Sequence, residues 1–209
     1  LRTVPSALSG TATGVGYSRD VTTLLALAQY IRNLGYQAYA SMNDTALSIP
    51  MAIQAGLGEY GRHGLLITKE FGPRVRIGKI FTDLPLAHDK PIQFGVKKFC
   101  NICRECTNAC PPGAIDDGKQ TETIYNQSNI PGIEKWTTDA EKCFDFWVKQ
   151  VTDCSICIRV CPYNRKMPKW AFKTWTNLMA TPLKRIILWL DRIIGQGKRN
   201  APSNWWKGI

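Results

Sequence analysis

The spacing of the cysteines is the feature that most narrows what this chain can fold into. The first group lies between Phe99 and Ile115, in "FCNICRECTNACPPGAI", and a proline follows its fourth cysteine. The second group begins at Cys143 and also ends with a proline. The two groups read C-x2-C-x2-C-x3-C-P and C-x10-C-x2-C-x3-C-P. The first is the spacing of the bacterial iron–sulfur run, whose fourth cysteine binds the other cluster in two-cluster proteins.

This crossed arrangement assigns all 8 cysteines to two [4Fe–4S] clusters. The ligands predicted for cluster 1 are Cys100, Cys103, Cys106 and Cys161. The ligands predicted for cluster 2 are Cys110, Cys143, Cys154 and Cys157. Zinc and disulfides are the alternatives, but disulfide frameworks are typical of small secreted domains and do not require this spacing. Two clusters that share crossed ligands lie close together and transfer single electrons.

The net charge of +11 is a second constraint on this 209-residue chain. A basic balance suits nucleic acid, an anionic membrane surface or acidic substrates. We favour a simpler interpretation, in which basic residues partly offset the negative charge of the two clusters. No run of about 18 apolar residues occurs, so no membrane-spanning helix is predicted, and no signal peptide is visible. Because the chain begins at Leu1, we expect a fragment of a longer protein.

Helical and strand patterns alternate in the chain before the clusters. Apolar residues at helical spacing predict a helix over 20–34, capped by Asp20 and ended by Gly35. A second helix is predicted to begin at Ser48, with Pro50 in its first turn. Strands are predicted at "YQAYA", "LLIT" and "RVRIGKIFTDLPL", and a turn at "MND". This alternation indicates an α/β or α+β layer.

The segment from Gly56 to Gly64, "GLGEYGRHG", contains four glycines. It fits neither the Walker A motif nor the dinucleotide fingerprint. Glycines let a backbone approach a large flat ligand closely, and a plain turn is the alternative interpretation.

Several further motifs occur in order with these elements: "GYS", "ND", "AGLGE" before "GR", "EFGPRVR", "TDLPL", "DKPI", "FGV" and the double cysteine run. Together they resemble the C-terminal half of the corrinoid-dependent reductive dehalogenases, over about Gly14 to Asn164. The resemblance implies an α+β chain with two [4Fe–4S] clusters and a cobamide as cofactors. The implied parts are a partial nitroreductase-like cobamide-binding domain at 1–92, a two-[4Fe–4S] bacterial-ferredoxin-like domain at 93–165 and a Trp-rich helical tail at 166–209.

The resemblance also implies an activity, the replacement of halide by hydrogen on a small organohalide. The implied acid is Tyr17, assisted by Asn43 and Arg76. A phenol keeps its proton at neutral pH because its pKa is about 10, and a nearby guanidinium would stabilise the phenolate. The amide of Asn43 can orient the phenol or the halogen. Without the resemblance, these three residues would be interpreted as a half-buried core residue, a turn residue and a surface residue.

The cobamide contacts implied by the resemblance lie in the glycine-rich segment. They are Gly56, Gly58, Gly61, Arg62 and His63. Neither His63 nor His88 lies in a D-x-H-x-x-G-type motif, so we expect no protein ligand to cobalt. His63 itself is expected to touch a polar edge or to be exposed.

The insertion after Cys143 carries three aromatic residues, Phe144, Phe146 and Trp147, close to cluster 2. Trp147 is the predicted aromatic wall of the substrate pocket, with ordinary core packing as the alternative.

The tail is rich in tryptophan, and "PLKRIILWLDRII" predicts a helix over 182–194. Its apolar residues cover a broad face, and charged residues such as Asp191 are expected elsewhere. Packing on the body is the preferred interpretation, and contact with a membrane surface is the alternative. The expected partners are an organohalide, an electron donor or membrane anchor protein, and a second copy in a homodimer, with no nucleic acid. The family's export signal implies a peripheral location in the periplasm or on the outer face of the cytoplasmic membrane.

Two other functions compete with this one. Epoxyqueuosine reductases share the cobamide fold and paired clusters but act on tRNA, and their carboxylate acid has no counterpart at the position of Tyr17. A plain electron-transfer ferredoxin would leave the chain before Cys100 without a role.

Overall fold

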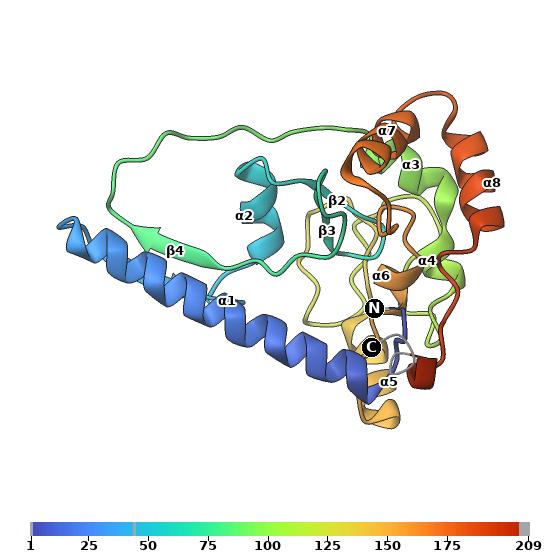
Figure 1. Ribbon diagram of the computed structural model, residues 1–209, viewed down its shortest axis with the longest axis horizontal. Helices are drawn as coiled ribbons and strands as arrows, with labels where there is room; N and C mark the ends of the chain where they lie inside the picture. The colour runs from blue at the N-terminus through green and yellow to red at the C-terminus, as the bar shows by residue number, and fades with distance from the viewer. Residues whose placement is uncertain (1, 44, 205–209) are drawn as a thin grey trace.

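Helix α1 (Ala7–Asn33) is the longest element of the computed structural model, which describes residues 2–43 and 45–204 (Figure 1). Its first turn is closed by a capping box between Ser6 and Ser9, each side chain bonding the other's backbone N–H. The prediction that the helix begins at Asp20 is therefore wrong. Residues 7–19 are mostly small and carry little apolar periodicity, so the pattern does not indicate a helix there. The predicted end is confirmed, since Gly35 follows the last turn with a φ of +94°.

Helix α1 packs against a two-stranded antiparallel sheet. Strand β1 (Ala38–Ser41) pairs with β4 (Lys79–Thr82) in a register that sets Ala38 opposite Thr82. A small core of Ala28, Ile31 and Ala38 fills the space between helix and sheet. A second pair, β2 (Glu59–Tyr60) with β3 (Leu66–Ile67), lies beside helix α2 (Ser48–Gln54). Strands were predicted for "YQAYA" and "RVRIGKIFTDLPL", and both contain a strand shorter than the predicted segment.

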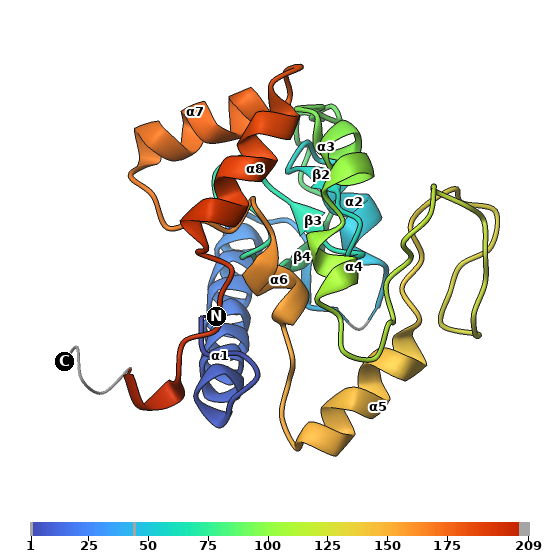
Figure 2. The same ribbon diagram turned by 90° about the vertical axis from the view of Figure 1, so that its right-hand side faces the viewer.

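The cysteine-rich part is built from short helices. They are α3 (Val96–Cys103), α4 (Glu105–Asn108), α5 (Ala140–Gln150) and α6 (Ile156–Val160). Arg104, between α3 and α4, has a φ of 55°, and Ser155, before α6, has a φ of 53°. These left-handed residues break what would otherwise be longer helices and turn the cysteines toward common centres. Figure 2 shows α5 and the loop before it on one side of the molecule, away from α7 and α8.

The main core joins segments that the sequence assigned to three domains. Ile67, Phe99, Tyr163, Met179 and Ile187 are all buried in one cluster. A second core contains Val4 together with Cys106, Ile115, Cys154, Ile156 and Val160. The boundaries at 92 and 165 stay a prediction, and the packing shows that the three segments share one interior.

The tail folds onto the body through α7 (Lys169–Met179) and α8 (Lys184–Ile194), and a 3-10 turn (Pro202–Asn204) follows. Helix α8 buries Ile187, Leu188 and Asp191, whereas Ile186 and Ile193 are exposed. Asp191 was expected on the polar side, and this expectation is wrong. Its carboxylate binds the buried guanidinium of Arg165, with Nε to Oδ1 at 2.5 Å and Nη2 to Oδ2 at 2.7 Å.

Two further points concern the predicted membrane contact and the tryptophans of the tail. Among the described residues, no helix combines the length and apolar character needed to cross a membrane. Two of the tail tryptophans, at 205 and 206, lie outside the described residues.

The Arg165–Asp191 pair generates the first prediction. Asp191→Ala leaves a buried guanidinium without its counter-charge and lowers the free energy of unfolding by about 3–5 kcal/mol. The matched control is Asp117→Ala, because Asp117 pairs with Arg104 at 3.3 Å on the surface. That change costs about 0–1 kcal/mol. Urea denaturation of the cluster-loaded protein measures both, and equal losses would contradict the account.

Candidate functional site

The four cysteines predicted for cluster 1 line one small buried pocket. Helix α3 carries Cys100 and Cys103, helix α4 carries Cys106, and Cys161 follows the last turn of α6. All four are buried, with 6–8% of each residue exposed. Cys161, the last cysteine of the second motif, thus lies beside the first three cysteines of the first motif. This is the crossing that the spacing predicts.

Burial holds these thiols in the protonated form when no metal is bound. It raises the pKa of Cys100 to about 11 and the pKa of Cys106 to about 12. The pKa of Cys161 is raised well above its usual value, first by burial and then by the charges of Cys100, Cys103 and Cys106. Iron displaces these protons, because a coordinating thiol is deprotonated outright. The pocket therefore suits a cationic metal cluster that neutralises four thiolates held close together.

The cysteines predicted for cluster 2 form a second, adjacent group. Burial raises the pKa of Cys143, and the charges of Cys110 and Cys154 raise it further. Burial also raises the pKa of Cys157 to about 12, with added contributions from Cys106, Cys154 and Cys143. Cys106 of the first group and Cys154 of the second lie in one buried cluster, with Cys157 packed against it, so the two cysteine groups are adjacent.

The alternatives of disulfides and zinc gain no support from these positions. All cysteines are free. Within residues 2–43 and 45–204, no three side chains of His, Cys, Asp or Glu converge as closely as a single metal ion requires. A cubane binds each thiolate through a different iron, so its ligands stand further apart than the ligands of one ion.

The crossing can be tested with paired cysteine variants of the full-length protein. Cys100 and Cys161 are far apart in the sequence but belong to one predicted cluster, so Cys100→Ala with Cys161→Ala leaves about four irons per chain. Cys157 and Cys161 share one motif but belong to different clusters, so Cys157→Ala with Cys161→Ala removes both. Iron analysis and electron paramagnetic resonance (EPR) after anaerobic reconstitution measure this. The reverse pattern would show that each motif binds its own cluster.

The three predicted catalytic residues come from separate segments and meet in space. Tyr17 lies in α1, Asn43 follows β1, and Arg76 precedes β4. The guanidinium carbon of Arg76 lies 4.5 Å from the centre of the Tyr17 ring. Asn43 Nδ2 donates to the Tyr17 hydroxyl at 3.4 Å. The Tyr17 phenol thus meets a guanidinium at its ring and an amide donor at its hydroxyl.

Two residues that the sequence did not single out support this group. Ser48 donates to Asn43 Oδ1 at 3.2 Å, and this bond turns the Asn43 amide nitrogen toward the phenol. Lys79 Nζ donates to Ser48 Oγ at 3.2 Å and to the backbone oxygen of Met42. The sequence marked Ser48 only as a helix start, and the contact with Lys79 of β4 depends on the β1–β4 pairing.

The glycine-rich segment is packed against the chain itself. A side chain at Gly58 would meet the backbone oxygen of Ile67 at 2.3 Å. A side chain at Gly56 would meet the backbone oxygen of Lys90 at 2.7 Å, and one at Gly61 would meet Ile67 Cδ1 at 2.7 Å. Close internal packing is therefore one reason for glycine at these positions. Their contact with a cobamide stays a prediction.

Arg62 is turned into the interior and is 2% exposed. Its Nε donates to the backbone oxygen of Cys100 at 3.1 Å. Its Nη1 donates to the backbone oxygens of Asp116 at 2.8 Å and Gly118 at 3.0 Å. The guanidinium also stacks on Trp136, 4.6 Å from the ring centre. These contacts fasten the glycine-rich segment to the helix that carries the first cluster ligands.

His63 is buried, so the expectation that it is exposed is wrong, and its contact with a polar edge stays a prediction. The imidazole lines the same pocket as Cys100, Cys103, Cys106 and Cys161. Burial lowers the pKa of His63 to about 4, so the ring is neutral at pH 7. Sequence reasoning missed this position because the fold, and not the local motif, brings residue 63 to the cysteines.

Comparison with known proteins adds the decisive observation. Residues 1–86 match the family described as "Reductive dehalogenase subunit", and residues 99–164 match "4Fe-4S double cluster binding domain". A tetrachloroethene reductive dehalogenase of Desulfitobacterium hafniense is 43% identical over 195 residues, 91% of this chain and 34% of that protein. The chain belongs to the reductive dehalogenases. It spans about a third of the length of the curated relative.

Solved structures of reductive dehalogenases agree with this assignment. One, described as suggesting a mechanism for B12-dependent dehalogenation, has a TM-score of 0.72 and 33% identity, covering 83% of this chain and 25% of that one. Another, in complex with 3-bromo-4-hydroxybenzoic acid, has a TM-score of 0.72 and 34% identity, covering 82% and 25%. The double-cluster module and the mixed helix and strand architecture of this dehalogenase chain are thus shared with known members.

The rival family shows a weaker similarity. An epoxyqueuosine reductase of Lactococcus garvieae (strain Lg2) is 31% identical over 132 residues, which cover 61% of this chain and 35% of that protein. The dehalogenase match is higher in identity and covers more of this chain.

Trp147 lies on α5, one turn after Cys143, and is 39% exposed. A hydrogen bond from the Trp147 side chain lowers the pKa of Cys143, against the larger effect of burial, which raises it. Its position beside a cluster 2 ligand is as expected, and its role as a wall of the dehalogenase substrate pocket stays a prediction.

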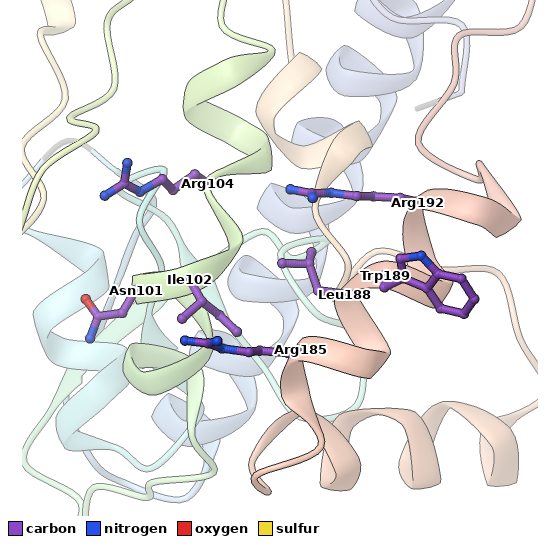
Figure 3. A pocket seen from close by; sticks show the side chains of 7 residues that line it. All are labelled: Asn101, Ile102, Arg104, Arg185, Leu188, Trp189 and Arg192. Atoms are coloured by element: carbon purple, nitrogen blue, oxygen red, sulfur yellow. The ribbon is translucent and has the colours of Figure 1, made fainter.

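A surface hollow lies between α8 and the start of the cysteine run. Figure 3 shows its lining side chains, which are Asn101, Ile102, Arg104, Arg185, Leu188, Trp189 and Arg192. Arg192 pairs with Glu105 at 2.7 Å, and Arg104 pairs with Asp117. Arg185 has no ion-pair partner in the described part of the chain. The hollow therefore presents positive charge beside Asn101 and Ile102, which lie between two ligands of cluster 1.

Proposed function

We propose that this chain is the electron-delivering and proton-donating part of an enzyme that replaces a halide on an organohalide with hydrogen. The observation that carries the proposal is the meeting of Tyr17, Asn43 and Arg76 on a chain that also holds the crossed cysteine groups. An electron carrier alone needs no such acid. The activity named for the D. hafniense relative is of this type.

The reaction balances with two electrons and one proton. The carbon–halogen bond breaks and releases halide, the carbon is reduced, and a carbon–hydrogen bond forms. The electrons arrive one at a time through the two clusters. The proton comes from the Tyr17 hydroxyl, and water returns it to the phenolate afterwards.

Each member of the catalytic group has a defined part in this step. Arg76 contributes a permanent positive charge at 4.5 Å from the ring centre, and the charge stabilises the phenolate that forms. Asn43 donates to the phenol oxygen, and that bond strengthens as the oxygen becomes negative. Ser48 keeps the Asn43 amide in the donating orientation.

We further propose that α1, β1, α2 and β4 are part of a nitroreductase-like domain that binds a cobamide. When bound, the cobamide supplies the low-valent cobalt that delivers electrons to the carbon–halogen bond. Residues 56–64 are the proposed contact segment. His63 is not a cobalt ligand in this proposal, because its side chain is buried at the cysteine pocket and its Nδ1 accepts the Leu65 N–H.

Tyr17→Phe tests the acid directly. In the full-length protein with both cofactors loaded, we expect halide release from tetrachloroethene to fall by about 100-fold or more, because general-acid catalysis contributes about 10²–10⁴-fold. Cobalt and iron contents stay unchanged. Tyr30→Phe is the matched control, since Tyr30 lies on the same helix, is 60% exposed and has no part in the catalytic group.

Three results would contradict the proposal. Tyr17→Phe at the rate of the unmodified enzyme would remove Tyr17 from the role of acid. Turnover of an epoxyqueuosine-containing tRNA stem loop, without halide release, would assign the chain to the rival family. An iron content of about eight with no cobalt would favour the plain electron carrier.

The arginine-lined hollow is the proposed docking surface for an acidic electron-donor protein. It presents Arg185 without an ion-pair partner and the exposed Trp189 beside the helix that carries Cys100 and Cys103. Complementary charge speeds the encounter of two proteins more than it tightens their complex.

Arg185→Glu therefore slows cluster reduction by a reduced acidic ferredoxin by about tenfold at low salt. The difference shrinks as ionic strength rises, because salt screens exposed charges. Lys119→Glu makes the same charge change on an exposed residue of the loop before α5 and is the control. Reduction by methyl viologen, a small cation, is the reference reaction for both variants. Equal slowing by the two variants would rule out a local docking site.

Several expectations stay predictions of the resemblance. They are the location in the periplasm or at the outer face of the cytoplasmic membrane, the homodimer, the membrane anchor protein and the absence of nucleic acid as a partner.

A further inference from the structure

The pocket of cluster 1 contains two buried polar atoms that have no hydrogen-bond partner in the described chain, His63 Nε2 and Tyr163 Oη. His63 is 5% exposed and Tyr163 is 0% exposed. A buried donor without a partner costs free energy, so native proteins nearly always satisfy such groups. Both residues line the pocket together with all four predicted ligands of cluster 1.

The proton on His63 is fixed by the backbone. Nδ1 accepts the N–H of Leu65 at 3.2 Å, so a neutral ring carries its proton on Nε2. Gly61 provides the room for this orientation, because a side chain there would lie 2.9 Å from His63 Cε1. Nε2 is therefore a donor that has no acceptor in the described chain.

Tyr163 is held by two aromatic rings. Phe94 and Phe99 make edge contacts with it at 6.2 Å and 5.6 Å between ring centres. Its hydroxyl is a donor that has no acceptor in the described chain, in the pocket that the four predicted ligands of cluster 1 line.

We propose that His63 Nε2–H and Tyr163 Oη–H donate hydrogen bonds to sulfur atoms of cluster 1 and raise its reduction potential. The reduced cluster carries one more negative charge, so donors to its sulfurs stabilise it more than the oxidised cluster. The proposal rests on cluster binding by residues 99–164 and not on dehalogenation. It assigns His63 to the electron-transfer chain and not to the cobamide.

Tyr163→Phe is the first test because it removes one oxygen and keeps the ring between Phe94 and Phe99. EPR-monitored redox titration of the full-length holoprotein measures both clusters. We expect the potential of one cluster to become more negative, while the other is unchanged. Electron–nuclear double resonance of the unmodified protein detects a proton coupling that disappears on exchange into D2O. In Tyr163→Phe this coupling is absent.

Tyr60→Phe is the matched control, because the Tyr60 hydroxyl already donates to the backbone oxygen of Trp136 at 3.1 Å. Neither cluster potential changes in that variant. His63→Phe lowers the potential of the same cluster as Tyr163→Phe, and His63→Gln, which keeps an N–H donor, restores it in part. Unchanged potentials in Tyr163→Phe and His63→Phe, with eight irons bound, would overturn the proposal whether or not the enzyme releases halide.

Discussion

A buried guanidinium joins the glycine-rich segment of this reductive dehalogenase chain to the helix that carries the first cysteines. Arg62 lies in the glycine-rich segment and bonds the backbone oxygen of Cys100, while its face stacks on Trp136. Glu59, in the same segment, accepts the backbone N–H groups of Phe94 and Val96 at the start of α3. The segment that precedes the cysteines thus holds the helix that supplies the first cluster ligands. A charged side chain this deeply buried persists because carbonyl oxygens satisfy it.

The proposed catalytic group depends on a different contact, the pairing of two strands. Tyr17, Asn43 and Arg76 come from a helix, a loop and the approach to a strand, and the pairing of β1 with β4 brings them together. The sheet has only two strands, so its stability depends on α1 packing across it. The placement of the proposed acid therefore depends on the contact between helix and sheet, and the placement of the predicted cluster ligands depends on the short helices that carry the cysteines.

The spacing of the cysteines predicted the cluster pocket well, because ligand spacing around a cubane is a local constraint that a sequence records directly. The candidate catalytic residues came from the resemblance, since a tyrosine beside a glycine carries no signal of its own. The start of α1 was missed because its first turns are held by Ser6 and Ser9 and not by an apolar face. The burial of His63 and Asp191 was missed because each depends on residues far away in the sequence.

The most direct test of this account is quantitative EPR of the anaerobically prepared, fully reduced holoprotein. Crossed ligands place two cubanes side by side, so we expect about eight irons per chain and the broadened spectrum of two interacting spins. A spectrum of isolated, non-interacting clusters, or a chain loaded with zinc alone, would contradict the claim that the two cysteine groups share their ligands.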